Sequence, residues 1–283
     1  MGDSATPVSL GTYGVWLRET VVTETIARGL EEHGYGALWL GGANGEVLEG
    51  ARIALSATTS LSVATGIVNI WTSDAKATAA SYHRLEELAP GRFLLGIGAG
   101  HREANGAQAI KPFQAMDDYL DVLDREGVPA DRRVLAALGP RMLRLSADRA
   151  AGAHPYLVNP EYTRSARATL GDGPLLAPEH KVAVVTDRAE GLRRAREGLA
   201  IYLDRGMQNY LNNFRRLGFE DSDFEAGGSE RLLDAMVAQG SPEAVAAEVR
   251  RHVDAGADHV PLHPIHDDAD VVDVMGRIAA ALH

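Results

Sequence analysis

The chain contains no cysteine among its 283 residues, which excludes disulfide scaffolds, thiolate zinc sites, iron–sulfur clusters and a thiol nucleophile. Lysine is scarce, because only Lys76, Lys111 and Lys181 occur and arginine supplies the rest of the 28 positive charges. No stretch approaches the roughly 20 apolar residues of a membrane-spanning helix. The first residues also lack a basic region followed by a long apolar run. We therefore expect a soluble, cytoplasmic protein.

Acidic residues outnumber basic ones by 39 to 28, for a net charge of −11. This balance argues against nucleic acid or an acidic membrane as the main partner. A hydrophobic content of 45% and a charged content of 24% are ordinary for a folded globular protein. We expect a small-molecule substrate as the partner, with a homodimer as an alternative to a monomer. The arginine bias fits genome composition, or anion recognition by guanidinium groups.

Short apolar runs alternate with amphipathic stretches along the whole chain. Periodicity and β-branched content predict helices between the runs, among them Thr20–His33, Pro112–Glu126 and Arg188–Leu203. The predicted strands are Val8–Gly14, Ala37–Leu40, Leu61–Ile70, Arg92–Gly98, Arg133–Leu138, Ala153–Val158, Lys181–Thr186 and His259–Leu262.

Eight such units in one chain of this length predict an α/β fold of the (β/α)₈ TIM-barrel type, as a single domain over residues 1–283. A doubly wound sheet is the alternative, but the first strand ends in GTYGVW and lacks its glycine-rich turn. A helical insertion, Asn209–Gly240, precedes the last strand and is longer than an ordinary connection.

In such a barrel the active site lies where the carboxyl ends of the strands open into the following loops. Glycines crowd these predicted ends, most densely in Gly96-Ile97-Gly98-Ala99-Gly100-His101. The pattern fits a tight turn, or a flat ligand lying against bare backbone with His101 placed to donate a hydrogen bond or a proton. Four aromatic residues at the strand ends are predicted to line the substrate pocket: Tyr13, Trp16, Trp71 and Tyr156.

A strand that stops at Gly139, with Pro140 at the first helical position, predicts an open helix start. The free N–H groups and the dipole of such a start form an anion site, to which Arg141 can add a charged contact.

His259, His263 and His266 lie near acidic residues and superficially resemble metal ligands. The run straddles a strand and a turn that contains Pro264, and nothing in the spacing fixes a convergent geometry. We therefore predict no metal site. Motifs of serine hydrolases, zinc proteases and P-loop nucleotide-binding proteins are absent from the sequence.

Several segments together resemble the luciferase-like superfamily of flavin- and deazaflavin-dependent enzymes. They are GRFLLGIGAGH, SVATGIVNIW, VLAALGPRMLRLSADRAAG and the closing AGADHV. More narrowly, the chain resembles the actinobacterial coenzyme F420-dependent oxidoreductases. The resemblance implies a tricyclic cofactor at the strand ends, and a cis peptide bond at Gly66–Ile67 behind its ring. The residues implied or predicted to contact this cofactor are Gly66, Ile67, Asn69, Gly98, Gly100, Gly139, Arg141 and Met142.

This chain also departs from the family pattern. Several F420-dependent members have an acidic residue at the end of strand two, where Gly41 and Gly42 stand here. We therefore predict His101 as the proton-carrying catalytic residue, because the ordinary pKa of histidine, about 6.5, suits proton transfer near neutral pH.

The predicted function is an F420-dependent oxidoreductase that transfers a hydride between C5 of the deazaflavin and a small organic substrate. The alternatives are an FMN-dependent monooxygenase and a barrel that binds a cofactor or a partner without turnover. Because F420 is anionic and the chain is acidic, its binding requires a basic patch at the barrel mouth. The candidates are Arg102, Lys111, Arg141, Arg164 and Arg167.

Overall fold

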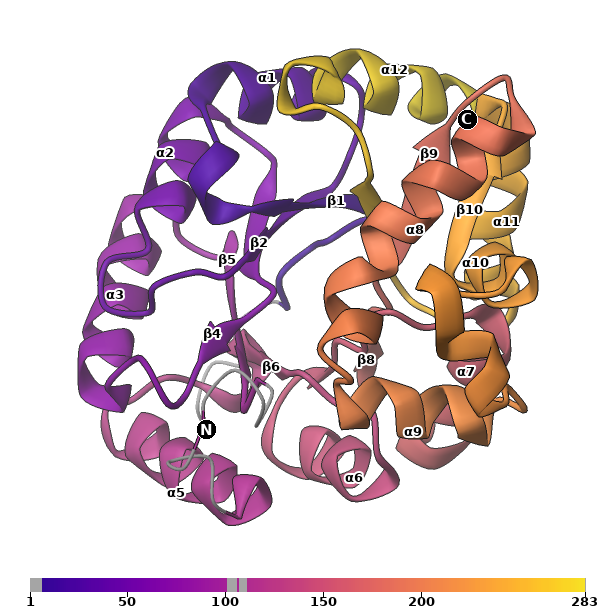
Figure 1. Cartoon of the computed structure of the whole chain (residues 1–283). Helices are drawn as coiled ribbons and strands as arrows, with labels where there is room; N and C mark the ends of the chain where they lie inside the picture. Colours follow the sequence, from indigo (N-terminus) through magenta and orange to yellow (C-terminus); the bar gives the residue numbers. More distant parts are fainter. Residues whose placement is uncertain (1–6, 101–105, 107–110, 283) are drawn as a thin grey trace.

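The computed structural model describes residues 7–100, 106 and 111–282 of the chain. Parallel strands form a ring at the centre of the molecule, and helices surround them (Figure 1). The strands are β1 (Tyr13–Arg18), β2 (Ala37–Gly41), β3 (Ser62–Thr65), β4 (Val68–Asn69), β5 (Phe93–Gly98), β6 (Arg133–Leu135), β7 (Gly152–Ala153), β8 (Leu175–Leu176), β9 (His180–Val184), β10 (Val237–Gly240) and β11 (Val260–Pro264). The helices are α1 (Glu24–Glu32), α2 (Glu49–Ala57), α3 (Ala75–Leu88), α5 (Pro112–Arg125), α6 (Pro140–Arg149), α7 (Pro160–Leu170), α8 (Arg188–Asp204), α9 (Gln208–Arg216), α10 (Glu230–Met236), α11 (Pro242–Asp254) and α12 (Val271–Leu282).

The strands pair in the order β10-β9-β11-β1-β2-β3-β5-β6-β7-β8, and β4 pairs with β5. β8 and β9 are separated by residues 177–179 alone, so the chain itself joins the two sides of the sheet. Within that link, Glu179 N–H donates to the carbonyl of Pro155 at 2.8 Å. The predicted alternation of strands and helices in a parallel α/β fold is confirmed.

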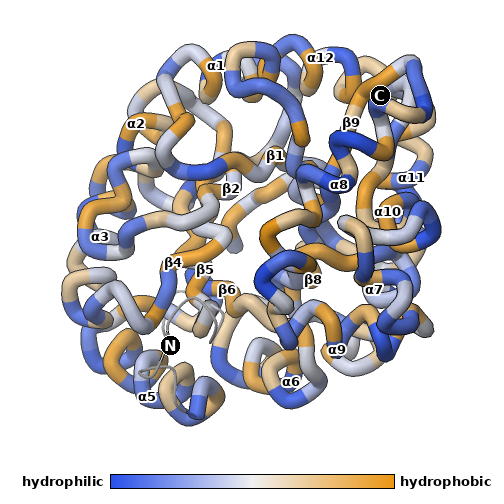
Figure 2. Tube along the Cα trace, viewed as in Figure 1, coloured by the Kyte–Doolittle hydropathy of each residue, from blue (hydrophilic) through white to orange (hydrophobic). Residues whose placement is uncertain are grey.

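Side chains alternate between the inside of the ring and the layer of helices. On β1, Trp16 belongs to an inner cluster with Trp39 of β2 and Leu94 of β5. Its neighbours Val15 and Leu17 pack outward into the larger core between the strands and the helices. Figure 2 shows hydrophobic residues on the central strands and hydrophilic ones along the outer parts of the helices. Such alternation is expected of parallel strands covered on both faces.

Two sequence predictions about the elements need correction. The first strand was predicted at Val8–Gly14 but forms at Tyr13–Arg18, because that segment places four consecutive residues in buried positions on both faces of the sheet. The segment Asn209–Gly240 does contain α9 and α10, but it ends in β10, which pairs in parallel with β9. Val237 and Ala238 are buried there, so their apolar side chains contribute to the sheet and not to a helix.

Within the described part of the chain, no helix has both the length and the apolar character needed to cross a membrane.

Candidate active site

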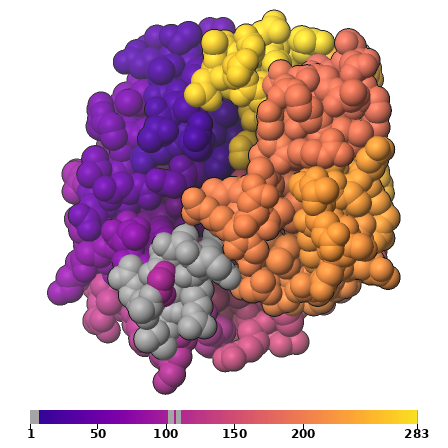
Figure 3. Space-filling view, in the orientation of Figure 1, coloured from indigo at the N-terminus to yellow at the C-terminus, as the bar shows by residue number. Residues whose placement is uncertain are grey.

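All paired strands of the sheet are parallel, so their carboxyl ends lie on one face, which we call the mouth. In the orientation of Figure 3, the orange α9–α10 region and the indigo and purple N-terminal half form opposite sides of the molecule. Tyr13 does not belong to the mouth, contrary to the prediction. It begins β1 and pairs with Val260, the first residue of β11, so it lies at the amino-terminal face.

Trp16 lies inside the ring near the mouth, and two glycines make room for its indole. A Cβ atom at Gly41 would lie 1.9 Å from Cζ2 of Trp16, and one at Gly66 would lie 2.7 Å from its Nε1. The indole Nε1–H donates to the carbonyl oxygen of Gly66 at 2.9 Å. Trp16 therefore fills the space beside Gly41, the position at the end of strand two where several F420-dependent enzymes have an acidic residue. Trp16, a predicted pocket residue, is only 7% exposed.

The Gly66–Ile67 peptide bond is cis, as the family resemblance implies. The side chain of Ile67 is half-buried and lies against the bare backbone of Gly98, where an added Cβ would meet Ile67 Cγ1 at 2.9 Å. On its other side the same Cβ would meet the methyl group of Ala136 at 2.8 Å. Gly66, Ile67 and Gly98 thus form one continuous wall across β3, β5 and β6.

Predicted residues after β4 and β5 extend this wall. The Asn69 Oδ1 accepts the backbone N–H of Trp71 at 3.0 Å, and the Trp71 indole donates to the carbonyl of Ala99 at 2.7 Å. Gly100 has φ +55°, a left-handed conformation that favours glycine. Asn69, Trp71 and Gly98 are therefore brought together, while His101 and Arg102 lie outside the described residues.

The wall continues to the first turn of α6, where Gly139 is the N-cap and no side chain caps the helix. A Cβ added at Gly139 would meet no atom within 4 Å, so the space beside it is open. Met142 is half-buried, and its backbone N–H donates to the Gly139 carbonyl at 3.0 Å. The exposed guanidinium of Arg141 lies 4.2 Å from the ring centre of Phe113, which keeps a positive charge beside this helix start.

Two of the predicted basic-patch residues lie elsewhere. Arg167 is bound at the amino-terminal face, where it donates to the carbonyl of Gly256 and pairs with Asp258 at 2.5 Å. Arg164 lines an outer cleft between α7 and α11 together with Asp254. Lys111, which precedes α5, and Arg141 are exposed cations flanking the described part of the mouth.

The opposite wall of the ring holds a buried ion pair between β8 and β9. Glu179 and Lys181 have side chains that are 0% and 1% exposed, and Lys181 Nζ donates to Glu179 Oε1 at 3.0 Å. The same carboxylate lies 2.8 Å from Nδ1 of His263 on β11, and its Oε2 accepts the Leu157 N–H at 2.9 Å. Burial alone would raise the pKa of Glu179, but the Lys181 charge and these hydrogen bonds hold it below the usual range.

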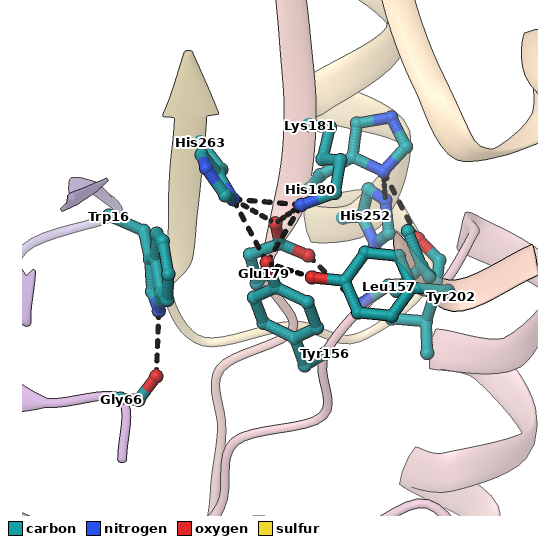
Figure 4. A network of polar contacts seen from close by, with 11 residues as sticks. Trp16, Gly66, Tyr156, Leu157, Glu179, His180, Lys181, Tyr202, His252 and His263 are labelled. Atoms are coloured by element: carbon teal, nitrogen blue, oxygen red, sulfur yellow. Dashed lines mark hydrogen bonds and ion pairs between the residues drawn. The ribbon is translucent and has the colours of Figure 1, made fainter. Parts of the chain in front are cut away.

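Tyrosines continue this polar cluster. The Tyr156 hydroxyl accepts a hydrogen bond from Lys181 Nζ at 2.8 Å and one from the Tyr202 hydroxyl at 2.9 Å. Lys181 Nζ also lies 4.5 Å from the centre of the Tyr156 ring, a favourable cation–π geometry. Figure 4 shows the cluster extending from Trp16 and His263 through the ion pair to the tyrosines. Tyr156, predicted from its strand end, therefore does belong to the interior of the mouth.

The Glu179–Lys181 pair was not predicted from the sequence. Lys181 was assigned to the start of a strand, and Glu179 was left in the preceding loop. A signal was present, since Lys181 is one of only three lysines and opens the apolar run KVAVV. A lysine inside such a run needs a buried counter-charge, which the carboxylate two residues earlier provides.

The remaining histidines of the last strand point to different partners. Trp39 Nε1 donates to Nε2 of His259 at 2.9 Å, and Nδ1 of His259 lies 2.8 Å from the carbonyl of Gly11. His266 Nε2 accepts the backbone N–H of Val184 at 3.0 Å. Each of the three histidines thus has its own hydrogen-bond partner on a different element.

The comparisons with known proteins agree with this architecture. The family model of the luciferase-like monooxygenases matches residues 16–126. No protein of curated function matches the sequence.

Solved structures with the same fold cover nearly the whole chain at low sequence identity. An F420-dependent secondary alcohol dehydrogenase in complex with an F420–acetone adduct aligns with a TM-score of 0.73 and 14% identity, over 96% of this chain and 99% of that one. The coenzyme F420-dependent tetrahydromethanopterin reductase from Methanopyrus kandleri aligns with a TM-score of 0.69 and 17% identity, over 98% and 100%. The oxygenating constituent of 3,6-diketocamphane monooxygenase from Pseudomonas putida, in complex with FMN, gives a TM-score of 0.65 and 14% identity, over 97% and 98%.

At these identities the structural neighbours establish the fold alone, whereas the family model matches the sequence itself from β1 to the end of α5. The matched segment, residues 16–126, is therefore similar to the luciferase-like monooxygenase family.

Proposed function

We propose that this protein is an oxidoreductase that binds coenzyme F420 at the mouth of the barrel and acts on a small organic substrate. The observation that carries the proposal is the uncapped start of α6 at Gly139, where an added Cβ would meet no atom within 4 Å, at the end of the wall that Gly66, Ile67 and Gly98 form. The sequence resemblance to F420-dependent oxidoreductases supports F420, while both F420-dependent and FMN-bound proteins share the fold.

The residues of this wall fit a flat ring with a phosphate-bearing tail. Ile67 presents a half-buried apolar side chain with no bulky neighbour at Gly98, as a ring face requires. At Gly139 the open space lies beside the first turn of α6, where backbone N–H groups and the helix dipole favour an anion. Arg141 adds a charge next to that turn.

A bound deazaflavin supplies or accepts the hydride, so the protein has to orient both partners and exclude water. The wall Gly66–Ile67–Gly98 would support the ring, and the α6 turn would hold a phosphate. Trp16 and Tyr156 form the described interior of the mouth beside them. His101 is proposed to carry a proton on sequence grounds.

Quenching of tryptophan fluorescence tests the cofactor directly, because Trp16 and Trp71 both lie at the mouth. We expect saturable quenching by micromolar F420 and no response to FMN. Quenching by FMN alone would support the flavin monooxygenase that the FMN-bound neighbour represents. A protein that responds to neither would be a barrel without this cofactor chemistry.

The phosphate site is tested by Arg141→Ala, with Arg144→Ala as the matched control on the same helix. Both arginines are exposed, but only Arg141 lies in the first turn. We expect about tenfold weaker F420 binding for Arg141→Ala, the size of a charge-assisted contact, and no change for Arg144→Ala. Equal affinities in both variants would remove Arg141 from the site.

A further inference from the structure

Trp16 lies between the Glu179–Lys181 ion pair and the wall formed by Gly66, Ile67 and Gly98. The proposed cofactor contacts do not include the ion pair. Trp16 bonds the Gly66 carbonyl, and its ring centre lies 4.2 Å from that of His263 (Figure 4). We propose that His263, oriented by Glu179 and Lys181, exchanges a proton with the substrate at Nε2, and that the substrate presents a hydroxyl or carbonyl oxygen there. The proposal rests on the proposed function, since transfer of a hydride to or from such a carbon requires a proton at its oxygen.

The proposal requires the ring proton of His263 to lie on Nδ1, beside Glu179. Nδ1 lies 2.8 Å from Glu179 Oε1, 2.9 Å from Lys181 Nζ and 3.2 Å from the Tyr156 hydroxyl. The lysine already donates to Glu179 and to Tyr156. An ionised carboxylate only accepts hydrogen bonds, so Nδ1 can donate to it, whereas the third N–H of Lys181 also lies within reach of Nδ1. The contacts admit both tautomers, and the proposal takes the one that donates Nδ1–H to Glu179 and leaves Nε2 its lone pair.

His263 is the member of this trio that reaches the mouth. Its side chain is 21% exposed, whereas those of Glu179 and Lys181 are fully enclosed. Among the described residues, no group forms a hydrogen bond with Nε2 of His263. This nitrogen is also not one of the fully buried polar atoms that lack a partner. Nε2 is therefore an acceptor open to a small molecule, with the Trp16 ring packed against one face of the imidazole.

The charges around His263 keep it neutral. Burial and the Lys181 charge lower the pKa of His263 to about 4, although the Glu179 carboxylate opposes the shift, and Arg18 at the end of β1 lowers it further. Burial raises the pKa of Tyr156, the other titratable side chain in contact, so this phenol is uncharged as well. At neutral pH the imidazole can therefore accept a proton.

The proton balance follows for alcohol oxidation. The C–H and O–H bonds of the substrate break and a C=O bond forms; the hydride would go to the proposed deazaflavin, which would serve as the oxidant, and the proton moves to Nε2 of His263. Glu179 Oε1, 2.8 Å from Nδ1, offsets part of the cost that burial and the Lys181 charge impose on the resulting imidazolium. In the opposite direction Nε2 returns the proton to a carbonyl oxygen. Glu179 and Lys181 are positioning residues in this scheme.

Nitrogen-15 NMR of the histidine side chains tests the geometry without any cofactor. We expect His263 to show a protonated Nδ1 and an unprotonated Nε2 down to pH 5. Adding 2-propanol as a probe should shift the Nε2 resonance of His263. His259 is the internal control, because both its ring nitrogens are occupied by Trp39 and Gly11. A proton on Nε2 of His263, or no response to 2-propanol, would overturn the proposal.

Kinetics with F420 and 2-propanol tests the role. We expect His263→Gln to lower the turnover at least 100-fold with F420 affinity retained, the usual size of a lost acid–base group. His83→Gln, on the outer helix α3, is the matched control with unchanged turnover. His101→Ala tests the other predicted proton carrier in parallel. Unchanged turnover in His263→Gln would overturn the proposal.

The pH dependence of turnover tests Glu179 and Lys181 as positioning residues. If their role were purely structural, substituting them would not shift this profile in a defined direction. Lys181→Met removes the charge that lowers the pKa of His263, so the acid limb of the turnover should move to higher pH. Glu179→Gln should move it to lower pH and slow the turnover at least tenfold. If one single variant fails to fold, the other carries the test, because each shifts the limb in its own direction; an unmoved acid limb in a folded single variant would refute the positioning role.

The two proposals fail in different ways. If neither F420 nor FMN quenches the tryptophans, the proposed function is wrong, whatever the state of His263. If F420 binds and the NMR of His263 shows the wrong tautomer, the cofactor assignment stands and the inference about His263 is wrong.

Discussion

The two walls of the barrel mouth are built from opposite kinds of residue. The wall from β3 to α6 is defined by missing side chains: at Gly66 and Gly98 a single added Cβ would meet neighbours within 3.0 Å. The wall from β8 to β11 is defined by side chains in contact, with Glu179, Lys181 and His263 within 3.0 Å of one another. The first wall suits a large flat ligand, and the second suits proton chemistry. Under the two proposals, cofactor binding and proton transfer fall to separate parts of one ring.

Acid should have the largest effect on stability, through buried histidines that lie outside both walls. Burial lowers the pKa of both His154 and His259 to about 4, so below the unfolded-state pKa of about 6.5 the unfolded chain binds protons that the folded protein excludes. Stability is therefore complete above pH 6.5 and falls as the pH drops towards 4, by about 3 kcal/mol for each histidine. Urea unfolding at pH 7.5, 6.0 and 5.0 measures this loss. A free energy of unfolding that stays constant over this range would contradict the burial of neutral histidines.

Breaking the ion pair should have the next largest effect. Lys181→Met leaves the Glu179 carboxylate enclosed without its cation, and such losses cost about 3–5 kcal/mol. The double variant Glu179→Gln/Lys181→Met removes both charges and should recover most of that stability. Thermal and urea unfolding of the unsubstituted protein, Glu179→Gln, Lys181→Met and the double variant completes a double-mutant cycle. If the double variant is as unstable as Lys181→Met, the polar wall is held by packing and not by charge.

The wall from β3 to α6 was predicted from the sequence far better than the wall from β8 to β11. Glycine carries its structural meaning locally, so Gly98 and Gly139 were found from strand ends and a helix start alone. The pairing of Glu179 with His263 depends on a sharp link between β8 and β9 and on a strand 84 residues further along the chain. No periodicity in the sequence encodes such a contact.

Errors in the predicted site follow from the same distinction. Tyr13 was assigned to the mouth because the first strand was predicted about five residues too early, and a shift of this size exchanges the two ends of a short strand. Trp16 and Tyr156 were assigned correctly to the mouth, but their partners were not predicted, since those partners come from β3 and β9.

Gly98→Ala is expected to have the smallest effect on folding. It is also the most direct test of the wall from β3 to α6 as a cofactor site. The added methyl group would lie 2.9 Å from Ile67 Cγ1 and 2.8 Å from the Ala136 Cβ, so Ile67 has to move towards the space of the proposed ring. We expect a loss of about 1–2 kcal/mol in stability, as for modest overpacking, together with at least tenfold weaker F420 binding.

Gly29→Ala is the matched control, because its added methyl group would lie 2.6 Å from Val272 between α1 and α12, away from the mouth. The crowding is at least as close as at Gly98, and better helix propensity offsets only part of it, so a comparable loss of about 1–2 kcal/mol is expected with unchanged F420 affinity. Fluorescence titration and urea unfolding of both variants separate the two effects. If Gly98→Ala binds F420 as tightly as Gly29→Ala does, the wall of glycines is a packing feature of the barrel, and the cofactor must be sought elsewhere at the mouth.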